Sequence, residues 1–90
     1  MAYNRKATQE ERKAFADAFN LFEKYAGFQT IQDRQQEDEW IKSFVQDRDK
    51  IAGQNNLGAF LTMAVIDYLD KAYVAWRDKN KKEAKADGTD

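Results

Sequence analysis

The segment 55–80 constrains the fold of this chain more than any other part of the sequence. It reads NNLGAFLTMAVIDYLDKAYVAWRDKN, and its first half is apolar on nearly every side. A helix that is apolar all round is typical of the centre of a bundle, whereas a surface helix carries one apolar stripe. We therefore expect a long central helix over residues 56–80, with other helices packed against it.

The composition favours a small domain made of helices. The chain has 90 residues, no proline, and a high content of Ala, Gln, Glu, Lys and Arg, which are good helix formers. A chain of this size buries roughly 60–65% of its unfolded surface, which allows one small core. Cysteine is absent, so disulfides and thiolate metal sites are excluded.

Two segments with one-sided apolar stripes precede the central one. At residues 8–11, TQEE is a capping box, in which Thr8 accepts from the amide of Glu11 and the Glu11 carboxylate reaches back. We expect a helix over 8–26, ended by Gly27 in the left-handed conformation, and a second helix over 33–52 capped by Thr30 or Asp33. The first stripe is Phe15, Ala18, Phe19, Phe22, Tyr25 and Ala26; the second is Trp40, Ile41, Phe44, Val45, Ile51 and Ala52.

The predicted fold is an all-α three-helix bundle with a long, central C-terminal helix. Short connections favour neighbouring antiparallel helices, so we expect the first two helices to pack antiparallel along the third. Gly53 is placed to end the second helix, and Asn55 or Asn56 to cap the third. The single domain would cover residues 8–80, between a flexible arm (1–7) and a flexible polar tail (81–90).

The sequence shows no targeting or membrane segment. The arm has no apolar run of the kind found in signal peptides, and the longest apolar run is too short to span a bilayer. The expectation is a small soluble protein of the cytoplasm.

The third helix carries more apolar side chains than two neighbouring helices need. One stripe is enough to receive both, namely Leu57, Leu61, Ala64, Val65, Tyr68, Leu69, Ala72, Ala75 and Trp76. A second set lies outside it, with Tyr73 on the flank: Phe60, Met63, Ile66, Asp67, Asp70 and Val74. Apolar side chains rimmed by charge are typical of a partner surface. The alternative is that the first two helices straddle the third and cover this second set.

We therefore predict a non-enzymatic protein–protein interaction module of adaptor or inhibitor type. The second set would be its partner-binding residues, and self-association through this outer face of the third helix is the first expectation, because two-fold oligomers are the commonest kind. A different protein target is the second expectation. The assignment of this class is an analogy with other small, cofactor-free helical proteins.

No catalytic, cofactor-binding or metal-binding residue is predicted. Nucleophilic catalysis needs a nucleophile beside a base, and the chain has one serine, Ser43, with no histidine or cysteine to activate it. Residues 47–58 begin like a calcium-binding loop, but Ala52 stands where that loop needs glycine and Gly58 where it needs glutamate.

Two alternative functions stand beside this prediction. A nucleic-acid-binding accessory protein would use Arg5, Lys6 and the late basic residues Lys71, Arg77, Lys79, Lys81, Lys82 and Lys85. The net charge of −1 argues against it. A small-ligand binder would line a cleft with Tyr25, Trp40, Tyr68 and Trp76, although aromatic residues in a small domain more commonly form its core.

Overall fold

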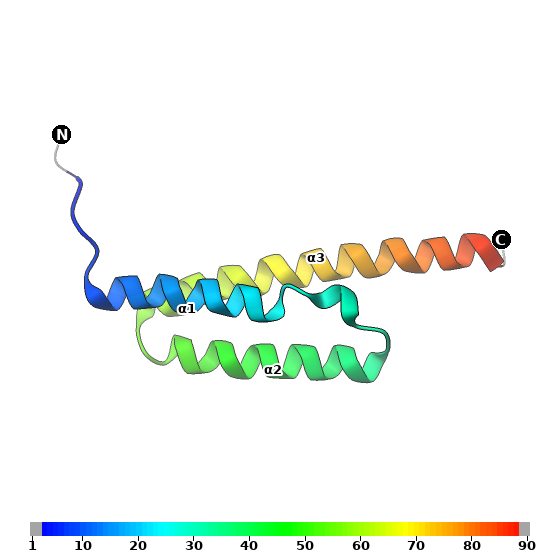
Figure 1. The fold of residues 1–90 in the computed structure, drawn as a ribbon, viewed down its shortest axis with the longest axis horizontal. Coiled ribbons are helices and arrows are strands. Elements are labelled where there is room, and N and C mark those ends of the chain that lie inside the picture. The colour runs from blue at the N-terminus through cyan, green and yellow to red at the C-terminus, as the bar shows by residue number, and fades with distance from the viewer. Residues whose placement is uncertain (1–2, 89–90) are drawn as a thin grey trace.

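The chain folds into three helices packed against one another (Figure 1). The structure is a computed structural model that describes the backbone of residues 3–88 and the side chains of residues 3–80. Its elements are α1 (Gln9–Tyr25), the short 3-10 turn η1 (Phe28–Thr30), α2 (Arg34–Ala52) and α3 (Asn56–Gly88). No strand occurs within residues 3–88. The predicted all-α three-helix bundle is confirmed.

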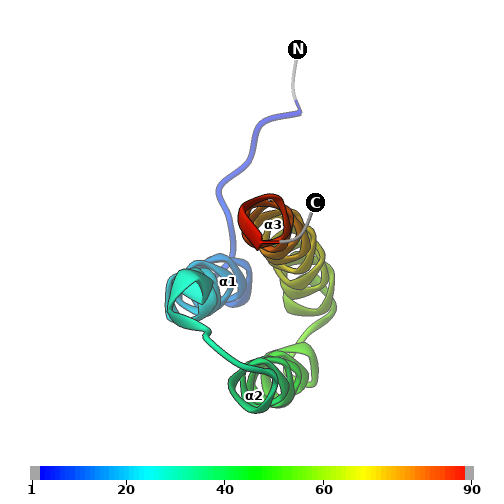
Figure 2. The ribbon, with the colours of Figure 1, turned by 90° about the vertical axis from the view of Figure 1, so that its right-hand side faces the viewer.

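The helices run up, down and up along a common axis (Figure 1). Viewed along that axis they stand at the corners of a triangle (Figure 2). α2 is antiparallel to both neighbours, but α1 runs parallel to α3 because two reversals of the chain separate them. The expected antiparallel packing along α3 is therefore correct for α2 only. α3 continues past Asn80, where the sequence predicts its end, and projects beyond the other two helices.

Local capping signals set where the helices begin. The Thr8 hydroxyl accepts from the amide of Glu11 at 3.1 Å, and the Glu11 carboxylate accepts from the amide of Thr8 at 2.9 Å. Asp33 accepts from the amide of Gln36 at 2.9 Å at the start of α2. The Asn55 side chain accepts from the amide of Gly58 at 2.6 Å at the start of α3. These side chains satisfy amides that have no partner within the helix.

The reversal after α1 differs from the prediction. Gly27 has φ −83° and ψ 38°, so the expected left-handed conformation is wrong, and no glycine of residues 3–88 has positive φ. The chain turns instead through η1, where the amide and the hydroxyl of Thr30 donate to the Gly27 carbonyl at 3.3 and 3.1 Å. A 3-10 turn provides the tight bend without a left-handed residue.

The core is aromatic and is shared by all three helices and η1. Phe44 of α2 is buried and stacks on Tyr25 of α1, with ring centroids 4.5 Å apart. Phe28 of η1 lies edge-on to Trp40 and to Tyr73, at 6.3 and 5.8 Å. The connection between α1 and α2 therefore contributes a core side chain as well as a turn.

The buried side of α3 is rotated away from the predicted stripe. Leu69 of that stripe is buried as predicted, but Ala64, Tyr68 and Ala75 are exposed. Thr62 and Tyr73, which lie outside the stripe, are buried instead. Thr62 can be buried because its hydroxyl donates to the Gly58 carbonyl at 2.6 Å, which satisfies its polar atom. α1 is rotated in the same way: it buries Ala14, Ala18, Leu21 and Tyr25 and leaves Phe15 and Phe19 exposed.

Candidate functional site

A groove between α2 and α3 contains four of the six predicted partner-binding residues. We call it the acidic groove; it measures about 280 Å³ and is lined by Trp40, Ile41, Phe44, Met63, Ile66, Asp67 and Asp70. The α3 residues recur at spacings of three and four, which puts them on one side of that helix. The predicted set thus acquires a facing wall from α2 that the sequence analysis did not assign to it.

The acidic groove combines an apolar floor with accessible walls. Phe44 is buried and Trp40 half-buried beneath it, while Ile41 and Met63 are 41% and 51% exposed. Asp67 pairs with Lys71 at 3.2 Å, and both side chains are well exposed. Asp70 forms no ion pair with any residue whose side chain is described. The α3 wall therefore carries an uncompensated negative charge.

The other two predicted residues do not line the groove. Phe60 is 75% exposed and lies on the side of α3 that points away from the core. Val74 is half-buried. The predicted set is therefore divided: four residues line the groove, and Phe60 and Val74 lie outside it.

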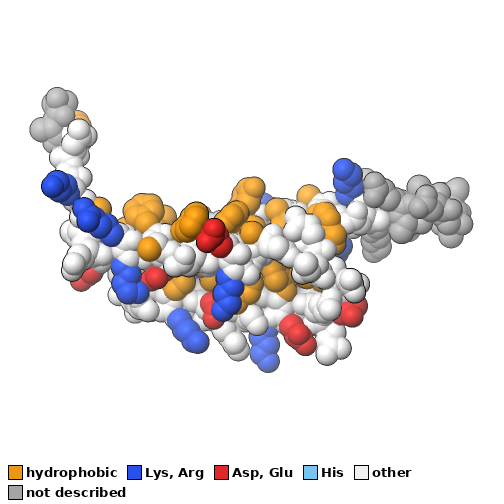
Figure 3. Space-filling view, viewed as in Figure 1, with side chains coloured by type: hydrophobic (Ala, Val, Ile, Leu, Met, Phe, Trp, Pro, Cys, Tyr) orange, Lys and Arg blue, Asp and Glu red, His pale blue; other side chains and the backbone are white. Residues whose placement is uncertain are grey.

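A second apolar surface was missed by the sequence analysis. Phe15 and Phe19 of α1 and Tyr68 of α3 are 56%, 60% and 63% exposed, and we call these three residues the aromatic face. Figure 3, with α1 towards the reader, shows hydrophobic side chains gathered along the upper part of the molecule, over α1 and α3. All three residues were assigned to buried stripes. The available signal was the breadth of the apolar side of α1, which includes Leu21 in addition to the predicted stripe and is wider than the buried side of a helix needs to be.

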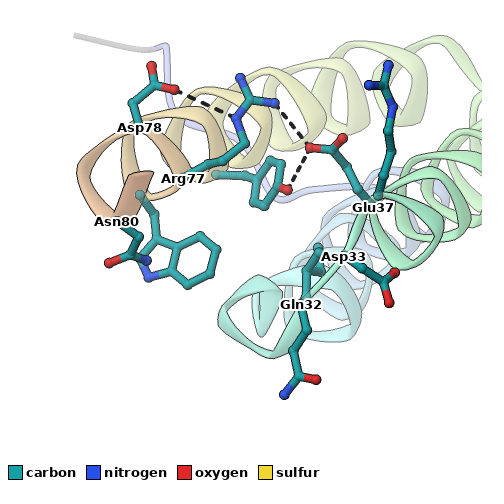
Figure 4. A pocket seen from close by; sticks show the side chains of 10 residues that line it. Gln32, Asp33, Glu37, Arg77, Asp78 and Asn80 are labelled. Carbon is teal, nitrogen blue, oxygen red and sulfur yellow. Dashed lines mark hydrogen bonds and ion pairs between the residues drawn. The ribbon is translucent and has the colours of Figure 1, made fainter. Parts of the chain in front are cut away.

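Two tyrosine–carboxylate contacts join α2 to its neighbours. Tyr73 of α3 donates to Glu37 at 2.6 Å, and Arg77 donates to the same oxygen at 3.1 Å (Figure 4). Further along α2, Tyr25 of α1 donates a short hydrogen bond to Asp47.

Each of these contacts also includes a cation. Lys24 donates to Asp47 at 2.7 Å and lies over the ring of Tyr25, 5.6 Å from its centroid. Arg77 lies over the ring of Tyr73 at 5.7 Å. Each carboxylate of α2 thus meets both a phenol and a cation.

The electrostatics of these contacts fix the protonation states. Burial, and then the bond to Glu37, raise the pKa of Tyr73 to about 12. Burial and Asp47 raise the pKa of Tyr25 further above its ordinary value. The bond from Tyr73, followed by Arg77, lowers the pKa of Glu37, and Lys24, followed by Tyr25, lowers that of Asp47. Groups shifted in these directions exchange protons poorly near neutral pH, which suits a structural role.

An open cavity lies beside the contact between Tyr73 and Glu37. It measures about 730 Å³ and is lined by residues from the connection between η1 and α2, from the start of α2 and from α3: Ile31, Gln32, Asp33, Arg34, Glu37, Tyr73, Trp76, Arg77, Asp78 and Asn80 (Figure 4). Arg77 is engaged by Glu37 and, at 3.7 Å, by Asp78. Its charge is therefore already balanced within the chain.

The four aromatic residues proposed for a ligand cleft do not come together. Trp76 lines the open cavity, Tyr25 and Trp40 line a separate depression near Thr30, and Tyr68 belongs to the aromatic face. Tyr25 is itself buried in the core.

Several basic residues proposed for nucleic-acid binding are engaged by carboxylates. Arg5 forms two hydrogen bonds to Glu11, at 2.8 and 2.7 Å, and Lys71 pairs with Asp67. The side chains of Lys81, Lys82 and Lys85 lie outside those described.

Within the part of the chain that the structure describes, no three acidic residues gather as a possible metal site. None of the helices there combines the length and the apolar character needed to cross a membrane. No protein family matches the chain, and comparisons with curated proteins and with solved structures likewise gave no match. The geometry of the described residues is therefore the basis for the function proposed below.

Proposed function

We propose that this chain is a non-enzymatic protein-interaction module, of adaptor or inhibitor type, that holds an amphipathic helix of its partner in the acidic groove. The observation that supports this function is the accessible apolar wall on each side of the groove, formed by Ile41 and Met63. A cleft between two antiparallel helices is the kind of surface into which an amphipathic helix lays its apolar side.

The acidic groove is small. Its volume of about 280 Å³ lies at the lower edge of the range of roughly 300–1,000 Å³ that is typical of ligand pockets. A site of this size accepts one or two side chains that project from a larger partner. Phe60, which is exposed on α3 outside the groove, is a single apolar residue, and single exposed apolar residues are common on protein surfaces without a binding partner.

Charge defines the chemistry of the partner. Asp67 and Asp70 stand on the α3 wall, and Lys71 offsets only the first of them. A partner helix that carries lysine or arginine beside its apolar anchor would complement both carboxylates. Complementary charge at the rim contributes more to specificity and association rate than to affinity.

A fluorescence titration tests this proposal. The chain has two tryptophans, and Trp76→Phe leaves Trp40, which lines the groove, as the single reporter. The probes are two synthetic amphipathic peptides of about four helical turns, one built from leucine and lysine and the other from leucine and glutamate. We expect the lysine peptide to shift the Trp40 emission saturably and the glutamate peptide to leave it unchanged.

Variants locate the binding site. Met63→Asp, and the pair Asp67→Lys with Asp70→Lys, should each weaken binding of the lysine peptide by about tenfold or more, equivalent to ~1.4 kcal/mol. Glu39→Lys is the matched control, because Glu39 is exposed on the other side of α2, near Thr30 and Ser43. Equal binding of both peptides, no binding of either, or equal effects of the groove and control variants would each refute the proposal.

A further inference from the structure

The aromatic face belongs to α1 and α3, since Phe15 and Phe19 are on α1 and Tyr68 is on α3. Figure 2 shows that a seam between these two helices opens away from α2. The ring of Phe22 lies 6.3 Å from that of Tyr68 and closes the bottom of the seam. Phe15 and Phe19 stand above it, more than half exposed. Two parallel helices with apolar side chains along their open side resemble a four-helix bundle from which the remaining helices are missing.

The α3 side of this seam is mainly apolar. Five residues that follow one another at spacings of three or four through Tyr68 are apolar: Leu57, Leu61, Ala64, Ala72 and Ala75. Lys71, three residues after Tyr68, flanks them and pairs with Asp67. The two alanines nearest the surface, Ala64 and Ala75, are exposed. Small side chains there would let another helix approach closely.

The α1 side carries one charge of each sign at its two ends. Arg12 lies one turn before Phe15, and Glu23 lies one turn after Phe19. Both side chains are exposed, and neither pairs with another residue of the part of the chain whose side chains are described. Other charged residues of α1 do have partners, namely Glu11 with Arg5, Lys13 with Asp17, and Lys24 with Asp47.

We infer that the aromatic face binds a second copy of this chain, with the two α1 helices antiparallel about a two-fold axis. Such an axis between Phe15 and Phe19 sets Phe15 against the partner subunit's Phe19 and brings Arg12 to within one residue of the partner subunit's Glu23, which its long side chain can reach. Symmetry repeats both contacts, so two ion pairs flank a cluster of aromatic rings. The charged and aromatic side chains along α1 are therefore complementary to the same side chains of a second copy, as a two-fold interface requires.

The resulting dimer completes a four-helix arrangement from α1 and α3 of each copy. It leaves the acidic groove free, because the groove lies on the α2 side of α3. The inference therefore does not rest on the function proposed above, and either can fail without the other.

Light scattering on the full chain measures this dimer. We expect the natural chain to approach twice its mass of 10.5 kDa as its concentration rises. Phe19→Asp should remain monomeric while circular dichroism shows the helical content unchanged. Phe60→Asp is the matched control, since it makes the same change at an exposed phenylalanine on the back of α3 and should leave the dimer intact.

Charge reversal tests the pairing itself. Arg12→Glu and Glu23→Arg, made singly, should each raise the dimer dissociation constant by about tenfold, because each sets like charges opposite one another. An equimolar mixture of the two single variants should form a heterodimer, since the opposite charges then meet again at both ends. A monomeric natural chain, single variants that dimerise normally, or a dimer disrupted by Phe60→Asp but not by Phe19→Asp would overturn the inference.

Discussion

The phenol of Tyr73 donates a 2.6 Å hydrogen bond to the carboxylate of Glu37 and joins α3 to α2. Tyr25 of α1 meets Asp47 in the same way further along α2. α2 therefore supplies the acceptor at both helix–helix contacts. Each acceptor is ionised and also paired with a cation, and hydrogen bonds to charged groups are among the stronger ones in proteins.

Removal of the Tyr73 hydroxyl should destabilise the fold. Tyr73→Phe keeps the ring that packs on Phe28 and Trp40 but loses the bond to Glu37. We expect a loss of about 1–2 kcal/mol, which lowers the melting temperature by roughly 4–16 °C in a domain of this size. Thermal unfolding followed by circular dichroism measures the change. Tyr3→Phe, at an exposed tyrosine, is the control, and equal melting temperatures would contradict the structural role of Tyr73.

Acid should weaken the bundle through the same carboxylates. The pKa values of Glu37 and Asp47 are lowered in the folded chain, whereas carboxyls of an unfolded chain titrate at about 4. Below that pH the unfolded state binds more protons, so the free energy of unfolding falls as pH drops from about 4 through the lowered folded pKa values. Urea unfolding between neutral pH and this acid range measures the slope.

Glu37→Gln should reduce this acid slope, because the variant removes one of the titrating groups. Glu39→Gln, at an exposed position on α2, serves as the control and should retain the slope of the natural chain. Identical slopes for both variants would show that Glu37 has no part in the acid response.

Replacement by alanine should lower the stability of the fold at one glycine, Gly58, and raise it at another, Gly27. A Cβ at Gly58 would lie 3.3 Å from the Ile51 carbonyl oxygen and 3.2 Å from the capping oxygen of Asn55. This crowding opposes the helix-propensity gain of about 1 kcal/mol for alanine and disturbs a cap worth about 0.5–2 kcal/mol. We expect Gly58→Ala to lower the free energy of unfolding by about 1 kcal/mol in total, as measured by urea unfolding.

Gly27 provides the comparison. A Cβ there meets nothing within 4 Å, and its φ of −83° suits any residue. Gly27→Ala should gain about 0.4–1 kcal/mol by restricting the unfolded chain. Stabilisation by Gly58→Ala, or destabilisation by Gly27→Ala, would contradict the surroundings described for these two glycines.

Truncation of Phe44 should destabilise the fold far more than truncation of Phe60. Phe44 is buried against Tyr25 and Trp40, and truncation of a buried phenylalanine costs about 3–5 kcal/mol. The total free energy of unfolding of a small domain is only about 5–15 kcal/mol, so the Phe44→Ala variant should be largely unfolded at moderate temperature. Phe60→Ala should stay within about 0.5 kcal/mol of the natural chain. Comparable melting temperatures for both variants would be incompatible with this core.

The helix starts were predictable because their signals are local. Thr8, Asp33 and Asn55 each bond to an amide three residues away, so a short stretch of sequence contains both partners. The turn after Gly27 was not predictable from local sequence. It depends on Phe28 of η1, which packs on Trp40 and Tyr73 from distant parts of the chain.

The rotation of each helix about its axis was the main feature that sequence did not determine. α3 is apolar on nearly every side, so periodicity alone leaves several orientations possible. The structure turns Tyr73 inward, where Glu37 satisfies its phenol, and packs α1 through the small residues Ala14 and Ala18. This choice places Met63, Ile66, Asp67 and Asp70 together, as their spacing indicated, but exposes Phe15 and Phe19, which had been assigned to the core.

The parallel alignment of α1 and α3 has a kinetic consequence. Pairing of α1 with α2, or of α2 with α3, closes only a short loop, whereas pairing of α1 with α3 must bridge the whole of α2. Loop-closure entropy is higher for that third pairing, although it grows slowly with length. Because most contacts are local, we expect folding within microseconds to milliseconds. The hairpin of α2 and α3 should form early, and the docking of α1 along α3 should be the last step to complete the core.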